Sequence, residues 1–193
     1  MERRKAILDA AEALLAEQGY EAATLKAIGE RAGIPVASMY HYFPDRHQVD
    51  VELLQRHTEA LEDRIVASLE RPGADALPEA VDSVVTPILD YFREHPSCTE
   101  LWFRGRSEAI DDMVRAFDEA QAVRLWHVLI ARGRIRPDTP VLVIQLAFEA
   151  GSRLFDVAFR RSPTGDDATM AEARRLVTAY LQTYAPEARE RQG

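Results

Sequence analysis

The 193-residue sequence contains one cysteine, Cys98, and this excludes an internal disulfide framework. It has no uncharged apolar run of the roughly 18 residues that a membrane-spanning helix requires. Its N-terminus leads from charged residues into an acidic amphipathic pattern, unlike the apolar core of a signal peptide. The apolar–polar alternation of strands, internal repeats and low-complexity tracts are also missing. These absences predict a soluble, cytoplasmic, all-α protein.

Basic residues are scarce relative to acidic ones, and the formal net charge is −8. The first fifty residues alone carry six Lys or Arg residues against eight Asp or Glu residues. Because attraction to phosphate supplies much of the affinity of proteins for DNA, charge alone slightly favours a function without DNA. A DNA-binding function therefore requires a local basic patch, for which the candidates are Arg3, Arg4, Lys5, Lys26 and Arg46.

The sequence motifs of common enzymes and metal sites are absent as well. There is no Gly-rich phosphate loop, no Gly-x-Ser-x-Gly turn and no His-Glu-x-x-His helix. His95 and Cys98 stand three residues apart, but no second pair follows, so zinc is not expected. We therefore predict no catalytic residues, no metal and no cofactor, although a fold can assemble a catalytic group from distant positions.

Apolar residues recur at helical spacing throughout the chain, and turn-forming residues divide this pattern into about nine helices. The length suits one large domain or a small one joined to a larger one. We expect a small domain over residues 1–50 and a larger helical domain over residues 51–193. The expected helices cover about residues 3–18, 24–32, 35–43, 45–69, the segment after the break at 71–73 up to 94, 97–104, 107–132, 139–161 and 168–184.

Residues 24–43 carry the most specific pattern of the sequence, because they combine the requirements of a helix-turn-helix. The Thr24 hydroxyl is placed to cap the first of two short helices. Gly33 supplies a residue that tolerates positive φ at the turn, and Gly29 is small enough for a close approach of the helices. Apolar residues fall at the positions that would meet between the helices, namely Ile28, Ala32, Ile34, Met39 and Tyr42.

The stretch TLKAIGERAGIPVASMYHYFPDR, residues 24–46, resembles the N-terminal signature of the tetracycline-repressor (TetR, AcrR-like) family of transcriptional regulators. The preceding segment AILDAAEALLAEQGY, residues 6–20, is similar to the first helix of that family. The resemblance covers about residues 3–54, and beyond them only length and helix order agree. Four positions depart from the common pattern. Pro35 stands where serine is common, Ala37 where glycine is, Tyr42 where histidine is, and Gly29 where alanine is.

The resemblance implies a recognition helix that lies in the major groove of DNA. Thr24, Arg46 and Tyr40 are then expected at phosphates, and Lys26 at a phosphate or a groove edge. Base edges are expected to meet Val36, Ala37, Ser38 and His41, and Tyr42 belongs to the same segment. A purely structural three-helix bundle is the competing interpretation, in which Tyr40 and Tyr42 pack internally. We expect Met39 and Phe43 to pack internally in either case.

The resemblance also implies that the larger domain binds a small molecule and forms a homodimer. The candidate ligand-binding residues are His95, Trp102, Phe103, Met113, Phe117, Trp126, His127, Phe148 and Glu149, with Arg153 as a further polar candidate. For each of them, an ordinary core or surface position is the competing interpretation. The last two helices are expected to pair with their counterparts in a second chain, although an intramolecular core is an alternative use of their apolar faces.

The predicted function is that of a ligand-responsive repressor, which a small molecule releases from a palindromic operator. An activator, or a regulator without a small ligand, has the same fold. A helical small-molecule-binding protein or enzyme that does not bind DNA remains the alternative from another class.

Overall fold

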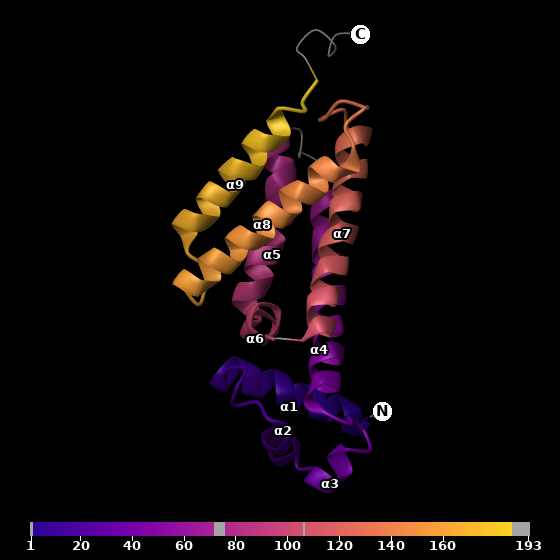
Figure 1. Cartoon of the computed structure of the whole chain (residues 1–193), viewed down its shortest axis with the longest axis vertical. Coiled ribbons are helices and arrows are strands. Elements are labelled where there is room, and N and C mark those ends of the chain that lie inside the picture. The colour runs from indigo at the N-terminus through magenta and orange to yellow at the C-terminus, as the bar shows by residue number, and fades with distance from the viewer. Residues whose placement is uncertain (1, 72–75, 106, 187–193) are drawn as a thin grey trace. The chain divides into compact units, whose positions relative to one another are not determined.

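The computed structural model of the chain describes residues 2–71, 76–105 and 107–186. Over these residues it contains nine helices and no strand (Figure 1), which confirms the predicted all-α fold. No helix among them has the length and apolar character needed to cross a membrane. The helices are α1 (Glu2–Gln18), α2 (Leu25–Ala32), α3 (Val36–Met39), α4 (Arg46–Leu69), α5 (Leu77–Glu94), α6 (Pro96–Arg104), α7 (Glu108–Ala131), α8 (Val141–Arg161) and α9 (Asp167–Gln182).

Side-chain caps explain where several helices begin. The Thr24 hydroxyl accepts a hydrogen bond from the Ala27 amide at 3.2 Å before α2. The Asp45 carboxylate accepts one from the Gln48 amide at 3.0 Å before α4, and Asp166 accepts one from the Thr169 amide at 2.9 Å before α9. Each cap satisfies an amide that has no partner within its own helix, an arrangement typically worth about 1 kcal/mol.

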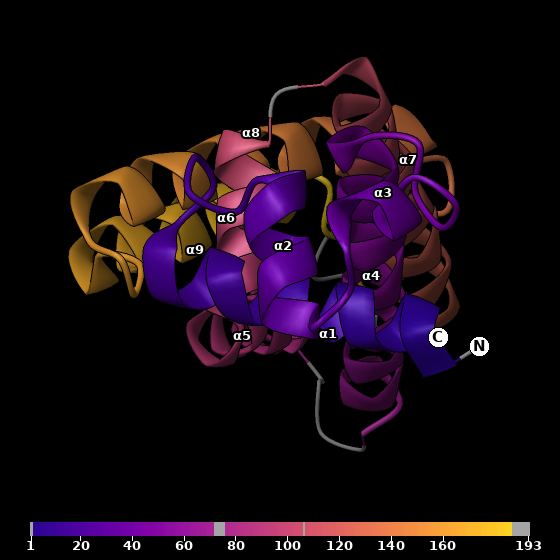
Figure 2. The same ribbon diagram turned by 90° about the horizontal axis from the view of Figure 1, so that it is seen from below.

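The described residues form two compact units, which differ from a simple division at residue 50. The first unit contains the chain up to Ala60 together with Glu94–Val114, and the second contains Leu61–Arg93 and the chain from Arg115 onward. The first unit takes in α6 and the start of α7 because Leu101 and Ile110 are buried in the same core as Ile7 and Ile28. Figure 2 shows α1, α2 and α3 of this unit.

The second unit has its own core, in which α5, α8 and α9 meet. The Phe92 ring lies edge-on to Phe155, with 6.0 Å between centroids, and to Phe159, with 5.6 Å between centroids. Such aromatic pairs add about 0.5–1.5 kcal/mol to the effect of burial. Gly165 joins α8 to α9 with φ +74°, and a Cβ there would lie 3.1 Å from side-chain atoms of Leu89 and Phe159.

Candidate functional site

The turn between α2 and α3 has the backbone geometry of a helix-turn-helix. Gly33 adopts the left-handed conformation at φ 66°, and the Ile34 amide donates to the Gly29 carbonyl oxygen at 2.9 Å. A Cβ on Gly29 would lie 3.0 Å from the Ile34 carbonyl oxygen and 3.1 Å from Met39 Cγ. The two helices therefore approach as closely at Gly29 as the sequence predicted.

Helix α3 is anchored by one face and presents the other to solvent. Met39 and, just beyond the helix, Phe43 are fully buried, as expected. Ala37 and His41 are exposed, Val36 and Ser38 are half-buried, and Tyr40 is 58% exposed. The exposed Tyr40 directly follows the buried Met39, so α3 lies at the surface and the segment is not tucked into the interior.

The candidate phosphate contacts Thr24, Lys26 and Tyr40 lie on the surface of the first unit. The Thr24 oxygen accepts the capping hydrogen bond, while its O–H remains a donor of the kind that phosphate oxygens accept. The Lys26 ammonium lies 3.9 Å from the Glu30 carboxylate, one turn along α2.

Arg46 lies in a different environment from the other candidates, because its side chain is only 19% exposed. Its Nε donates to Asp50 Oδ1 at 2.6 Å, and its guanidinium lies over the Tyr20 ring at 4.7 Å. The Tyr20 hydroxyl donates to the other Asp50 oxygen at 3.0 Å. Burial raises the pKa of Asp50, and the Arg46 charge opposes that shift. Arg46 thus joins the start of α4 to the loop after α1, and its phosphate contact stays a prediction.

Tyr42 is half-buried and packs against the core of the first unit. Its carbonyl oxygen accepts a hydrogen bond from Arg4 Nη1 at 3.0 Å. The side chain therefore contributes to internal packing, which was the competing interpretation of Tyr42. Its role at DNA stays a prediction.

Most basic residues of this surface already pair with carboxylates. Besides Lys26 and Arg46, Arg4 pairs with Glu52 in α4, Lys5 lies 3.8 Å from Asp9, and Arg31 lies 2.6 Å from Glu17. The Arg46–Asp50 pair is buried, but the other pairs are exposed. Exposed pairs contribute about 0–1 kcal/mol each, so a phosphate can replace their carboxylates at small cost. The local basic patch therefore consists mainly of cations that must exchange partners to contact DNA.

The predicted ligand-binding residues divide between the two compact units. His95, Trp102, Phe103 and Met113 belong to the first, and Phe117, Trp126, His127, Phe148 and Glu149 belong to the second. In the first unit, Trp102 and Phe103 line an open depression of about 470 Å³ together with Gly105, Ser107, Glu108 and Asp111.

In the second unit, Phe117 is buried and Phe148 is half-buried, whereas His127 and Glu149 are exposed. The Trp126 indole N–H is satisfied internally, because it donates to the Thr139 carbonyl oxygen at 2.8 Å. Of the ligand-binding residues predicted in this unit, the aromatic ones lie in or near the interior, and the polar ones lie at the surface.

Sequence reasoning missed a polar group inside the second unit. Gln121 is 1% exposed, and among the described residues neither atom of its side-chain amide has a hydrogen-bond partner. One turn earlier on α7, Asp118 accepts a hydrogen bond from the Ser152 hydroxyl at 2.6 Å. Burial raises the pKa of Asp118 to about 6. The only indication in the sequence was that Asp118 and Gln121 stand three residues apart on an otherwise apolar helix face, and this spacing matches no known motif.

Comparison with known proteins assigns both parts of the chain. Residues 7–49 match the family described as bacterial regulatory proteins, tetR family. Residues 76–181 match the tetracyclin repressor-like C-terminal domain. The second match covers more than half of the chain, and the first contains the helix-turn-helix described above.

Two curated relatives and one solved structure agree with these matches. The repressor KstR of Rhodococcus jostii is 34% identical over 68% of this chain and 59% of its own length, so the chain spans about three fifths of that relative. The regulator BetI of Cronobacter sakazakii is 25% identical over 93% of this chain and 89% of its own.

A crystal structure of a TetR-family transcriptional regulator from Streptomyces coelicolor superposes with a TM-score of 0.70. It is 32% identical and covers 94% of this chain and 99% of its own. Sequence, fold and helix-turn-helix geometry agree, and the chain belongs to the tetR family of bacterial regulatory proteins.

Proposed function

We propose that the protein is a homodimeric transcriptional repressor that binds a palindromic operator through α3 and releases it when a small molecule binds. The proposal rests mainly on the orientation of α3. Buried Met39 and Phe43 anchor this segment, while Ala37, Tyr40 and His41 face solvent. A helix anchored in this way can enter a major groove without exposing core residues. Helix-turn-helix dimers read two half-sites whose spacing matches that of the paired recognition helices.

Exposed leucines on α8 and α9 support the homodimer. Leu142 and Leu146 are one turn apart on α8 and are 56% and 50% exposed, and Leu176 on α9 is 50% exposed. Helices α8 and α9 pack against each other, so both contribute to one helical layer. Burying a leucine side chain contributes about 1.5–3 kcal/mol, which makes this layer a favourable contact for a second copy.

The polar group within the second unit supports a small-molecule effector. The unsatisfied amide of Gln121 can both donate and accept a hydrogen bond, and the half-buried aromatic residues Trp126 and Phe148 belong to the same unit. Leaving a buried polar group unsatisfied costs about 1–3 kcal/mol. We therefore propose an effector with an apolar body and at least one hydrogen-bonding group.

Helix α4 provides the connection between the two activities. It begins at Arg46 in the first compact unit and continues beyond Leu61 in the second. An effector that favours one arrangement of the dimer changes the population that fits the operator. By linkage, operator DNA must then weaken effector binding by the same factor.

The test is DNA binding by the full chain to the promoter upstream of its own gene, measured by gel shift or fluorescence anisotropy. Tyr40→Ala is expected to weaken binding to all sequences alike, whereas substitutions of Ser38 or His41 change the preference among sequences. His127→Ala, an exposed histidine of α7, is the control and leaves binding unchanged.

Absence of binding at low salt, where attraction to phosphate is strongest, would contradict the proposal. Equal losses for Tyr40, Ser38 and His41 variants would contradict the assigned roles. Addition of candidate effectors to the same assay tests release from DNA.

A further inference from the structure

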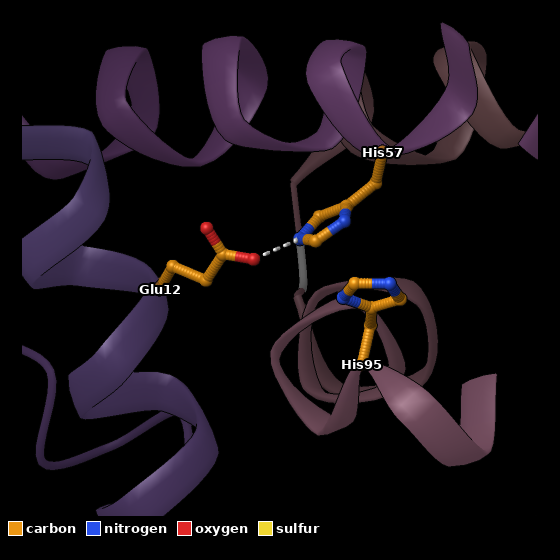
Figure 3. Close-up of side chains that lie close together, drawn as sticks. All are labelled: Glu12, His57 and His95. Atoms are coloured by element: carbon orange, nitrogen blue, oxygen red, sulfur yellow. Dashed lines mark ion pairs between the residues drawn. The ribbon is translucent and has the colours of Figure 1, made fainter. Parts of the chain in front are cut away.

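Three residues that are far apart in the sequence meet inside the first compact unit. Glu12 comes from α1, His57 from α4, and His95 directly precedes α6 (Figure 3). Each offers one ligand atom, and these atoms all lie within 4.8 Å of one another. Glu12 Oε1 is 4.0 Å from His57 Nε2, and the two imidazole rings are 5.8 Å apart at an angle of 58°.

The packing of α4 explains why His57 points to this place. Leu53 and Leu61, one turn before and one turn after it, are fully buried, so position 57 lies on the core-facing stripe of the helix. The His57 side chain is accordingly 3% exposed, while Glu12 is 29% exposed and leaves an approach from solvent. His95 is placed by the start of α6, where Pro96 fixes the first turn.

Polar groups surround the imidazole nitrogen of His57 that the site would use. Ser97 Oγ lies 3.3 Å from His57 Nε2, and Glu12 Oε1 lies 4.0 Å from the same nitrogen. Metal coordination requires a neutral imidazole, so an ion at Nε2 would displace the contact with Ser97.

Glu12 is held by an outer partner. Arg56 forms an ion pair with Glu12 Oε2, which leaves Oε1 turned towards His57. Arg56 also contacts Asp9 at 3.0 Å, so its charge is shared between two carboxylates. Outer-shell partners of this kind orient the ligands of metal sites.

We propose that Glu12, His57 and His95 bind a divalent transition-metal ion of which Zn²⁺ is representative. Two imidazoles and one carboxylate are a common three-residue ligand set for zinc, and they leave a fourth position for water. Zinc bonds of about 2.0–2.2 Å place tetrahedral ligand atoms about 3.4 Å apart. The 4.0 Å between Glu12 Oε1 and His57 Nε2 then closes by about half an ångström.

The site does not use the His95–Cys98 pair, which the sequence analysis had examined as possible zinc ligands. Cys98 is fully buried, and burial, together with the Glu12 charge, raises the pKa of its thiol. A protonated thiol is a poor ligand, and the ligand group does not include it. The partner of His95 is instead His57, which no sequence spacing indicated.

Isothermal titration of the full, tag-free and EDTA-treated chain with Zn²⁺ tests the site. We expect one ion per chain, a raised melting temperature, and no response to Mg²⁺, which prefers oxygen ligands. His95→Gln and Glu12→Gln are each expected to lower the affinity at least about tenfold, since even outer-shell changes cost that much. His47→Gln, which removes an exposed histidine outside the ligand group, is the matched control.

Circular dichroism establishes that each variant is folded. X-ray absorption of the Zn²⁺-loaded wild-type chain is expected to count two imidazole ligands, and this measurement does not depend on the variants. No Zn²⁺ binding, fewer than two imidazoles, or equal affinities of wild type and His95→Gln would overturn the proposal. None of these measurements uses DNA, so a negative result for the metal site would not contradict the proposed repressor function, and the reverse also holds.

Discussion

Alanine at Gly33 is expected to strain the helix-turn-helix without creating a clash. Gly33 has φ +66°, and apart from its two chain neighbours no residue has an atom within 4 Å of the position where a Cβ would stand. The left-handed conformation costs an L-residue about 1–2 kcal/mol. For a chain of this size, that corresponds to a melting temperature lower by about 2–8 °C.

Two other glycines provide matched controls for this value. Gly133 has φ +60° and also has no atom near a Cβ, so Gly133→Ala is expected to cost the same free energy of unfolding. Gly165 has φ +74°, but its Cβ would meet Leu89 and Phe159 at 3.1 Å. Overpacking adds about 1–3 kcal/mol, so Gly165→Ala is expected to be the most destabilising of the three.

Chemical denaturation of the three variants measures these differences, and operator binding separates local from global effects. Relief of the strain at Gly33 is expected to displace α3 from the position that fits the operator. A loss of about 1.4 kcal/mol in the free energy of operator binding corresponds to about tenfold weaker binding, which is the largest effect we expect. Gly133→Ala is expected to bind the operator like wild type. Unchanged stability of Gly33→Ala, or equal loss of operator binding in Gly33→Ala and Gly133→Ala, would refute the reasoning.

Three further predictions concern the dimer, a buried carboxyl and the basic surface. Leu146→Asp places a charge in the exposed apolar layer of α8, and sedimentation is expected to show dissociation at concentrations where Glu59→Gln, an exposed change on α4, leaves a dimer. Asp118 has its pKa raised to about 6 by burial, so the native state binds more protons than the unfolded state between about pH 4 and 6, and stability falls as pH rises through this window. Asp118→Asn is therefore expected to flatten this decline and to raise the free energy of unfolding at pH 8 by on the order of 1 kcal/mol; an unchanged pH profile would contradict the assignment. Glu30→Gln removes the partner of Lys26 and is expected to strengthen operator binding about twofold, since an exposed pair is worth about 0.3–0.5 kcal/mol. Glu172→Gln changes the net charge equally and serves as the control, so an equal gain from both would assign the effect to overall charge.

Local signals predicted the helices well. Thr24 and Gly33 mark their helix ends through a cap and a positive φ, both of which depend on neighbours within a few residues. The starts of α4 and α9 depend on equally local contacts, because Asp45 and Asp166 cap them from within three residues. Met39 and Phe43 were predictable as core residues because their spacing places them on one face.

Features that depend on distant contacts were not predictable. The burial of Leu101 and Ile110 against the core of α1 and α2 enlarges the first compact unit beyond residue 50. Arg46 was expected at the surface, yet its partner Asp50 and the Tyr20 ring hold it half-buried. The unsatisfied amide of Gln121 also emerges only once the surrounding helices are in place.

The carboxylates that accompany Arg4, Lys5, Lys26 and Arg31 bear on how such a protein searches a genome. Every phosphate contact made by these cations releases a carboxylate to solvent, so random sequence offers little net attraction, and residence there is brief. Only a site whose base edges fit α3 compensates for the exchange. Selectivity then arises partly from a short residence time on nonspecific DNA, which matters when competing sites number about 10⁶–10⁹.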